Sequence, residues 1–239
     1  MKLILRSAKV THVGLVRTNN EDSAYAGRRL AAVADGMGGM PAGELASDIV
    51  MSALAPLDKS KDAGDAAQAL REALDRANQQ IRATAESDAS QDGMGTTVTS
   101  LLLSGDTITL VHVGDSRCYM RRDGEVTQLT KDDTFVQSLV DQGVLTAAEA
   151  RAHPRRSIVT QAVQGDELVP EVAQMTVGPG DRFLVCSDGL SDWVTADSIV
   201  ETLTSVDDPD LCAGRLVDLA LVAGAPDNVT VVVADVVKA

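Results

Sequence analysis

Apolar and polar positions alternate along this chain in two rhythms, one typical of strands and one typical of helices. Apolar runs of strand length predict β-strands at residues 3–13, 98–103, 107–113, 171–177, 182–186 and 228–237. Apolar residues spaced three and four apart predict amphipathic helices at residues 41–57, 65–86, 196–203 and 210–222. We therefore expect both kinds of element to pack together in this chain.

The pattern between these elements predicts how they are connected. Residues 14–23 are polar and predict a turn, whereas residues 98–129 predict an antiparallel meander with a tight hairpin signal, RDG, at 122–124. From residue 130 to 164 the pattern changes to short helical pieces, which we interpret as an inserted flap. No internal repeat or low-complexity linker separates the parts, so we expect a single domain over residues 1–239.

Carboxylates stand at the ends of several predicted strands. Residues 31–35 are an apolar run that ends on Asp35 and then breaks into glycines. A structural turn is a sufficient explanation for any one Asp-Gly pair, because both residues favour turns. The same arrangement recurs beside three further strands, at Asp115, Asp188 and Asp227. This repetition favours a functional site over four unrelated turns.

The composition narrows the classes of protein to consider. The chain has a formal net charge of −14 and only 2% aromatic residues, so we do not expect it to bind nucleic acid. Its three cysteines have no metal-ligand spacing, so we expect reduced thiols and a cytoplasmic protein. No apolar stretch is long enough for a signal peptide or a membrane span, and no membrane association is expected.

The acidic residues have a specific chemical use. Carboxylates and water are the preferred ligands of Mg²⁺ and Mn²⁺, and two such ions about 4 Å apart can activate a water molecule for attack on phosphorus. Arg17 offers a planar fork of donors for a phosphate dianion, although a surface ion pair with Glu21 or Asp22 explains it equally well. A group of acids with one arginine near it therefore indicates an enzyme that hydrolyses phosphate esters.

Six short motifs carry a family resemblance. They are RTNNEDS at 17–23, VADGMGG at 33–39, GMGTT at 93–97, VGDSR at 113–117, SDGL at 187–190 and DNVT at 227–230. Together, and in this order, the chain resembles the metal-dependent protein phosphatases of type 2C, most closely their bacterial serine/threonine branch. The resemblance implies an α+β fold, a four-layer α-β-β-α sandwich with two antiparallel sheets and a dinuclear metal cleft at one end.

The resemblance also implies a set of metal ligands. Asp35 would bridge two divalent ions, Mn²⁺ or Mg²⁺, and the carbonyl of Gly36 would bind the first. Asp188 and Asp227 would hold the second ion, while Asp115 together with Asp188 would serve a looser third site.

The resemblance assigns roles to residues around those ligands. Arg17 would bind the substrate phosphate and act with Asp35 in catalysis. Glu21 and Asp22 would act through metal-bound waters or by orienting Arg17, and Asn228 would support the turn that it follows.

Two departures from the family pattern concern the general acid and the flap. Met37 and Met40 stand where many relatives have histidine, so the proton for the leaving group would come from a metal-bound water or from a residue that the substrate brings. Residues 131–134 and 157–161 also differ from the usual flap sequences, which leaves the role of the flap open.

These observations lead to a functional hypothesis with two alternatives. The chain is expected to hydrolyse phosphoserine and phosphothreonine on proteins by direct attack of a metal-bridging hydroxide, in signal transduction opposing a bacterial serine/threonine kinase. A monomer is expected. The alternatives are a phosphoprotein-binding regulatory pseudophosphatase and a partner-switching phosphatase with the same chemistry. The sequence leaves the preferred metal and the physiological substrate open.

One basic cluster has no role in this hypothesis. Arg151, Arg155 and Arg156 lie together in the predicted flap, either as a solvated helix end or as a contact for acidic phosphoproteins.

Overall fold

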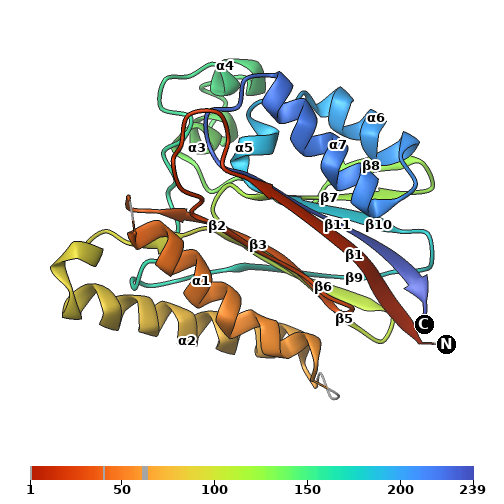
Figure 1. The fold of residues 1–239 in the computed structure, drawn as a ribbon, viewed down its shortest axis with the longest axis horizontal. Coiled ribbons are helices and arrows are strands. Elements are labelled where there is room, and N and C mark those ends of the chain that lie inside the picture. Colours follow the sequence, from red (N-terminus) through yellow and green to blue (C-terminus); the bar gives the residue numbers. More distant parts are fainter. Residues whose placement is uncertain (1, 40, 61–63) are drawn as a thin grey trace.

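Two antiparallel β-sheets lie face to face, and helices cover the outer face of each (Figure 1). The computed structural model describes residues 2–39, 41–60 and 64–239. The first sheet has the strand order β1 (Leu3–His12), β11 (Val229–Lys238), β10 (Arg182–Cys186), β7 (Arg117–Arg122) and β8 (Glu125–Gln128). The second sheet has the order β2 (Asp22–Ala26), β3 (Leu30–Met37), β5 (Val98–Ser104), β6 (Thr107–Val113) and β9 (Glu171–Thr176), and the short β4 (Gly95–Thr96) pairs with the end of β3.

The helices form the two outer layers. The second sheet is covered by α1 (Ala42–Leu54) and α2 (Ala66–Ser87), and the first sheet is covered by α5 (Asp188–Ser191), α6 (Ala196–Ser205) and α7 (Pro209–Val222). Two short helices, α3 (Phe135–Asp141) and α4 (Ala147–Arg151), lie over one end of the sandwich (Figure 1). This arrangement confirms the predicted α-β-β-α sandwich.

Three layers of apolar side chains hold the four layers of backbone together. Strand β3 shows how one strand serves two of them, because successive side chains of a strand point to opposite faces. Ala31 and Val33 pack between the two sheets, whereas Leu30, Ala32 and Ala34 pack against α1 and α2. Asp35 is the next residue of β3 in the series that begins with Ala31 and Val33, so it stands at the end of the layer between the sheets.

The predicted elements are confirmed in most places. The helix predicted at 65–86 is α2, and it begins after Asp65, whose side chain accepts hydrogen bonds from the backbone of Ala67 and Gln68. The helix predicted at 41–57 ends earlier, at Leu54, and continues as a 3₁₀ turn, Ala55–Asp58, which includes a proline.

The predicted meander over residues 98–129 is wrong. The β5–β6 hairpin belongs to the second sheet, whereas the β7–β8 hairpin belongs to the first. The chain crosses between sheets at Gly114, whose φ is +102° and where a Cβ would lie 2.6 Å from Thr97 Cγ2. Hairpin signals identify local pairs of strands but not the sheet that each pair joins.

Two strand boundaries also differ from the prediction. The polar turn predicted at 14–23 ends two residues earlier, because Asp22 begins β2. All five residues of β2 are half-buried, so the strand lacks the alternation that would have identified it. The strand expected to end at Asp35 continues as β3 to Met37.

Residues 130–164 are the segment that we interpret as a flap, and Asp133 fastens the base of this segment to the sandwich. The backbone N–H of Asp133 donates to the Gly114 carbonyl at 2.7 Å, and the Gly114 N–H donates to Asp133 Oδ2 at 2.9 Å. The Asp133 carbonyl in turn accepts from the N–H of Thr160, near the other end of the flap. The flap therefore begins and returns at one point beside the end of the sheets.

Within the described residues, no helix has both the length and the apolar character needed to cross a membrane.

Candidate active site

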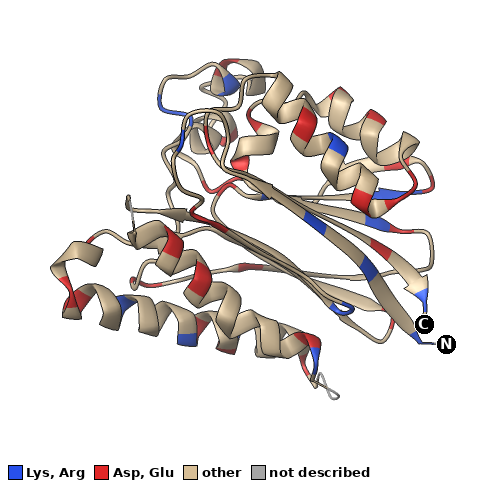
Figure 2. Ribbon diagram, in the orientation of Figure 1, with Lys and Arg blue, Asp and Glu red and all other residues tan. Residues whose placement is uncertain are grey.

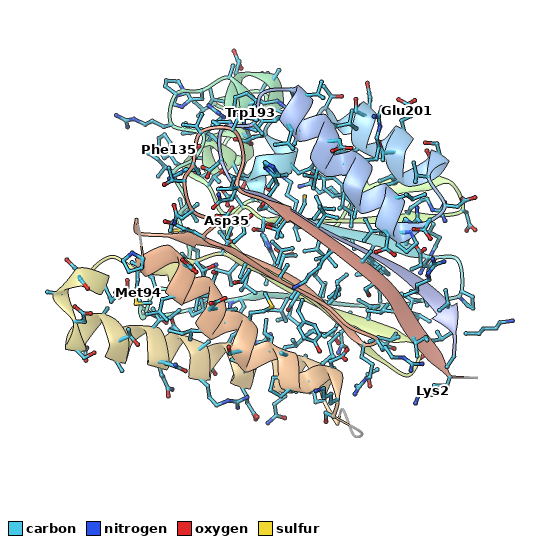
Figure 3. All side chains as sticks on the ribbon, viewed as in Figure 1. Lys2, Asp35, Met94, Phe135, Trp193 and Glu201 are labelled. Carbon is cyan, nitrogen blue, oxygen red and sulfur yellow. The ribbon has the colours of Figure 1, made fainter. Side chains whose placement is uncertain are left out.

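Asp35 lies at the end of the sandwich that the flap covers (Figure 3). Two threonines of the GMGTT motif fix its backbone. Thr97 donates its N–H to the Asp35 carbonyl at 2.9 Å and accepts the Asp35 N–H on Oγ1 at 3.1 Å, and Thr96 Oγ1 donates to the same carbonyl at 2.9 Å. The carboxylate therefore stands on a rigid backbone.

Other carboxylates reach the same place from separate elements. Asp22 is the register partner of Asp35 on the neighbouring strand β2. Asp115 lies in the turn between β6 and β7, Asp188 is the first residue of α5, and Asp227 precedes β11. The fold therefore brings together every acid that the sequence analysis placed in the site.

All of these acids except Asp22 line a cleft of about 350 Å³. Its lining also includes Arg17, Gly36, Met37 and Asn228. Five carboxylates line it, namely Glu21, Asp35, Asp115, Asp188 and Asp227.

Two glycines allow the backbone to approach closely around the cleft. A Cβ on Gly36 would lie 2.2 Å from the Gly43 carbonyl oxygen and 2.5 Å from that of Glu21. A Cβ on Gly189 would lie 1.9 Å from the Asn228 carbonyl oxygen. A larger residue at either position would push apart the elements that carry the acids.

Asn228 joins the loop before β2 to the turn that holds Asp227. Its Oδ1 accepts the Glu21 N–H at 2.7 Å, and its Nδ2 donates to the carbonyls of Val13 and Asn19 at 3.0 and 2.9 Å. Its own N–H donates to Asp227 Oδ1 at 2.8 Å. The Asn228 side chain is buried, and its bond to the Glu21 N–H is shielded from water.

Arg17 stands at the rim of the cleft with a half-exposed side chain. Its Nη2 lies 2.8 Å from Asp227 Oδ2, so its ionic partner is neither Glu21 nor Asp22, the two that the sequence suggested. The pair is solvent-exposed, with side-chain exposures of 52% and 41%, and it contributes little to stability. The guanidinium is therefore free to exchange this partner for another anion in the cleft.

Repulsion and burial raise the pKa of the clustered carboxyl groups. Burial, together with repulsion from neighbouring acids, raises the pKa of Asp22 to about 6 and that of Asp115 to about 7. Burial also holds the pKa of Asp35 well above its usual range, with repulsion from Asp22 and Asp188 adding to it. The pKa of Asp188 is well raised for the same reasons, with Asp115 as the first repelling neighbour.

The donor set suits hard divalent cations. All cleft acids offer oxygen, and Asp22 Oδ1 is shielded from solvent without a hydrogen-bond partner among the described residues. The described His, Cys, Asp and Glu side chains do not form a ready-made group of three or more ligands. The ligands come singly from different elements, so the site fits ions that keep several waters.

Histidine is absent from the described residues that line the cleft. Met37 lies in the lining, whereas Met40 is outside the described residues. His112 is buried in β6, with Nδ1 2.8 Å from Thr99 Oγ1 and Nε2 3.0 Å from the Lys131 carbonyl. Both ring nitrogens therefore have partners, and His112 has a structural role.

Sequence reasoning gave no individual role to the residues that hold the acids in place. Thr97 lay unassigned within GMGTT, and Ser187 within SDGL. Ser187 Oγ donates to Asp22 Oδ2 at 2.9 Å and accepts the Thr230 N–H at 3.0 Å. The sequence signal that could have identified Thr97 and Ser187 is their position inside the motifs of the family resemblance.

A two-sheet sandwich with a carboxylate-lined cleft at one end defines the class of metal-dependent phosphatases of type 2C. The family model described as protein phosphatase 2C matches residues 16–213. The chain belongs to this protein phosphatase 2C family.

Known proteins support this assignment over nearly the whole chain. The serine/threonine protein phosphatase PstP of Mycobacterium tuberculosis is 52% identical over 235 residues, which is 98% of this chain and 46% of PstP. The protein phosphatase PhpP of Streptococcus pneumoniae is 36% identical, covering 93% of this chain and 94% of PhpP. This chain thus spans about half the length of PstP.

A solved structure resembles the whole sandwich. The catalytic domain of PstP in complex with two manganese ions has a TM-score of 0.94 and 50% identity, covering 99% of this chain and all of that one.

The raised pKa values predict how stability depends on pH in chelator-treated protein. Because the folded-state pKa of Asp35 lies above its unfolded value, the contribution of Asp35 to stability is fully present at low pH and is lost as the pH rises through the folded value. Asp35→Asn cannot ionise, so we expect it to match the wild type near pH 4 and to exceed it at pH 8 by on the order of 1 kcal/mol. Urea unfolding across this range measures the difference. The exposed Asp75→Asn serves as the control, and an equal or falling advantage for Asp35→Asn would contradict the prediction.

Proposed function

We propose that this chain is a metal-dependent serine/threonine protein phosphatase that hydrolyses phosphoserine and phosphothreonine on proteins. The observation that carries the proposal is the cleft itself, which gathers five carboxylates and places one half-exposed guanidinium at its rim. The names of PstP and PhpP, both phosphatases, support it.

We assign the cation ligands as the family resemblance implies. Asp35 and the Gly36 carbonyl would hold the first of two divalent ions, Mn²⁺ or Mg²⁺, and Asp35, Asp188 and Asp227 would hold the second. Asp115 with Asp188 would serve a looser third site. The crowding of buried carboxylates supports this assignment, because burial and mutual repulsion raise the pKa values of Asp35 and Asp188 and a bound cation would offset both effects.

The protein's own groups would bind and orient the phosphate. When bound, divalent cations supply Lewis acidity toward the phosphoryl group and toward water. The two outer nitrogens of Arg17 would donate to phosphate oxygens, exchanging Asp227 for the substrate. Glu21 accepts a hydrogen bond from Asn19, and Asp22 accepts one from Ser187. These two acids would therefore act through metal-bound waters rather than by orienting Arg17 directly.

We further propose that residues 1–239 form a single type 2C phosphatase domain with the flap inserted at about 130–164. The inter-sheet core supports this, since it combines strands from both ends of the chain, such as Leu5 of β1 and Val236 of β11, with Leu101 of β5.

The cellular setting of this activity is also a proposal. We place the enzyme in the cytoplasm, in signal transduction that opposes a serine/threonine kinase, acting as a monomer on phosphoproteins. The free, buried thiols of Cys118, Cys186 and Cys212 support a reducing compartment.

Turnover by the purified chain tests the proposed activity. We expect hydrolysis of para-nitrophenyl phosphate and of a phosphothreonine peptide with Mn²⁺ or Mg²⁺, and none with chelator. Asp188→Asn removes one charged ligand and should reduce turnover by at least about 100-fold, whereas Asp75→Asn on α2 should not. Silence of the wild type with metal shown to be bound would instead support the phosphoprotein-binding pseudophosphatase.

Substitution of Arg17 tests phosphate recognition. Arg17→Ala removes the donor fork, so we expect the KM for the phosphothreonine peptide to rise roughly tenfold with a smaller change in kcat. Arg17→Lys keeps the charge without the planar fork, so its KM should lie between those of the wild type and of Arg17→Ala. Steady-state kinetics separate the parameters, and an unchanged KM for Arg17→Ala would refute the assigned role.

A further inference from the structure

A second cavity lies beneath the flap, next to the catalytic cleft. Its volume is about 360 Å³, and its walls come from α3 and α4 of the flap and from β7 and α5 of the sandwich. Asp115 and Asp188 line both this cavity and the cleft, so the two spaces are direct neighbours. We call it the under-flap cavity. A polypeptide with its phosphate in the cleft could place a nearby side chain there.

The under-flap cavity concentrates positive charge in a strongly acidic protein. Apart from the two shared carboxylates, its acids are Asp132 and Asp192. Four cations also line it, namely Arg117, Lys131, Arg151 and Arg156. Figure 2 shows Lys and Arg positions on α4 and on the loop beside it. Away from the mouth, therefore, the lining carries more positive than negative charge.

Ion pairs neutralise some of these cations but leave Arg151. Arg117 binds both carboxylate oxygens of Asp132, and Arg156 Nε lies 3.1 Å from Asp192 Oδ2. Lys131 Nζ lies 2.6 Å from Asp141 Oδ2. Arg151 Nη2 instead donates to the carbonyls of Ser191 and Val194, both at 3.1 Å, which carry no net charge. Its guanidinium therefore retains its charge at the wall of the cavity.

Ser191 supplies a second, independent sign of a ligand. This residue of α5 lines the cavity and is only 3% exposed, yet its Oγ has no hydrogen-bond partner among the described residues. Buried hydroxyl groups are normally satisfied, and a hydroxyl next to a guanidinium can donate to an anionic oxygen.

We propose that the under-flap cavity is a substrate subsite that binds an acidic side chain close to the phosphorylated residue of the protein substrate. This proposal rests on the proposed phosphatase function. Arg151 supplies the charge and Ser191 a hydrogen bond, while Val136 and Val140 of α3 contact the aliphatic part of the bound side chain. The subsite gives the flap a role in substrate choice.

Matched peptides test the proposal. Phosphothreonine peptides would carry one glutamate at successive positions on either side of the phosphothreonine, with glutamine or lysine in the same place as references. We expect the wild type to prefer glutamate over glutamine at one position by roughly five- to tenfold in kcat/KM, and the preference to weaken at high salt. Hydrolysis of para-nitrophenyl phosphate, which has no flanking residues, reports on the cleft separately.

Variants of the flap connect the preference to this cavity. Arg151→Gln should remove the glutamate preference, and Arg151→Glu should shift it toward lysine, a reversal that mere loosening of the flap would not produce. Ser191→Ala removes the proposed hydrogen bond without altering the flap, so it covers the case in which the Arg151 variants fold poorly, and it should reduce the preference. The neighbouring Arg155→Gln is the matched control, because Arg155 is exposed and does not line the cavity, and it should keep the wild-type preference.

The outcomes separate the two proposals. No glutamate preference in a wild type that hydrolyses para-nitrophenyl phosphate, or a preference that Arg151→Glu leaves unchanged, would overturn the subsite and show the cluster to be a solvated surface. Failure of the wild type on every substrate with metal present would overturn the phosphatase function instead.

Discussion

Mutual repulsion among carboxylates at one end of the sandwich is the constraint on which the rest of this structure depends. Burial in the cleft and repulsion between like charges both disfavour ionisation of these acids, and the raised pKa values of Asp35 and Asp188 reflect burial first and repulsion second. A chain without further support would relax by moving the acids apart. The fold prevents this by tying each acid to a backbone that cannot move alone.

Those ties run between elements that are distant in sequence. Thr97, between β4 and β5, holds the backbone of Asp35, and Asn228 holds the loop before β2 against the turn of Asp227. Gly189 lets α5 approach that same turn more closely than any side chain would allow. The apolar layers that press the sheets and helices together thus supply the stability that holds the charges in place. The same rigidity keeps the cleft ready for cations and phosphate.

Much of this could be predicted from the sequence, because the relevant signals are local. The apolar run before Asp35 and its glycines indicated a strand leading to a cleft, and the spacing of apolar residues placed α2 within one residue at each end. Contacts between residues that are distant in the sequence could not be predicted in this way. The partner of Arg17 is 210 positions away, at Asp227, and no pattern in residues 98–129 indicates that their two hairpins join different sheets. The under-flap cavity exists only once the flap folds back over α5, so the arginines of its wall appeared as a plain surface cluster.

Calorimetric titration of the chelator-stripped protein with Mn²⁺ at pH 6.5, in buffers of different ionisation enthalpy, measures directly whether the acids are gathered to hold cations. We expect saturation at two strong equivalents per chain, as in the manganese complex of PstP. We also expect release of protons on binding, because burial and mutual repulsion raise the pKa values of Asp35 and Asp188, the acids assigned to the two ions. Absence of saturable binding, or binding without proton release, would contradict the claim that the acids are gathered to hold cations.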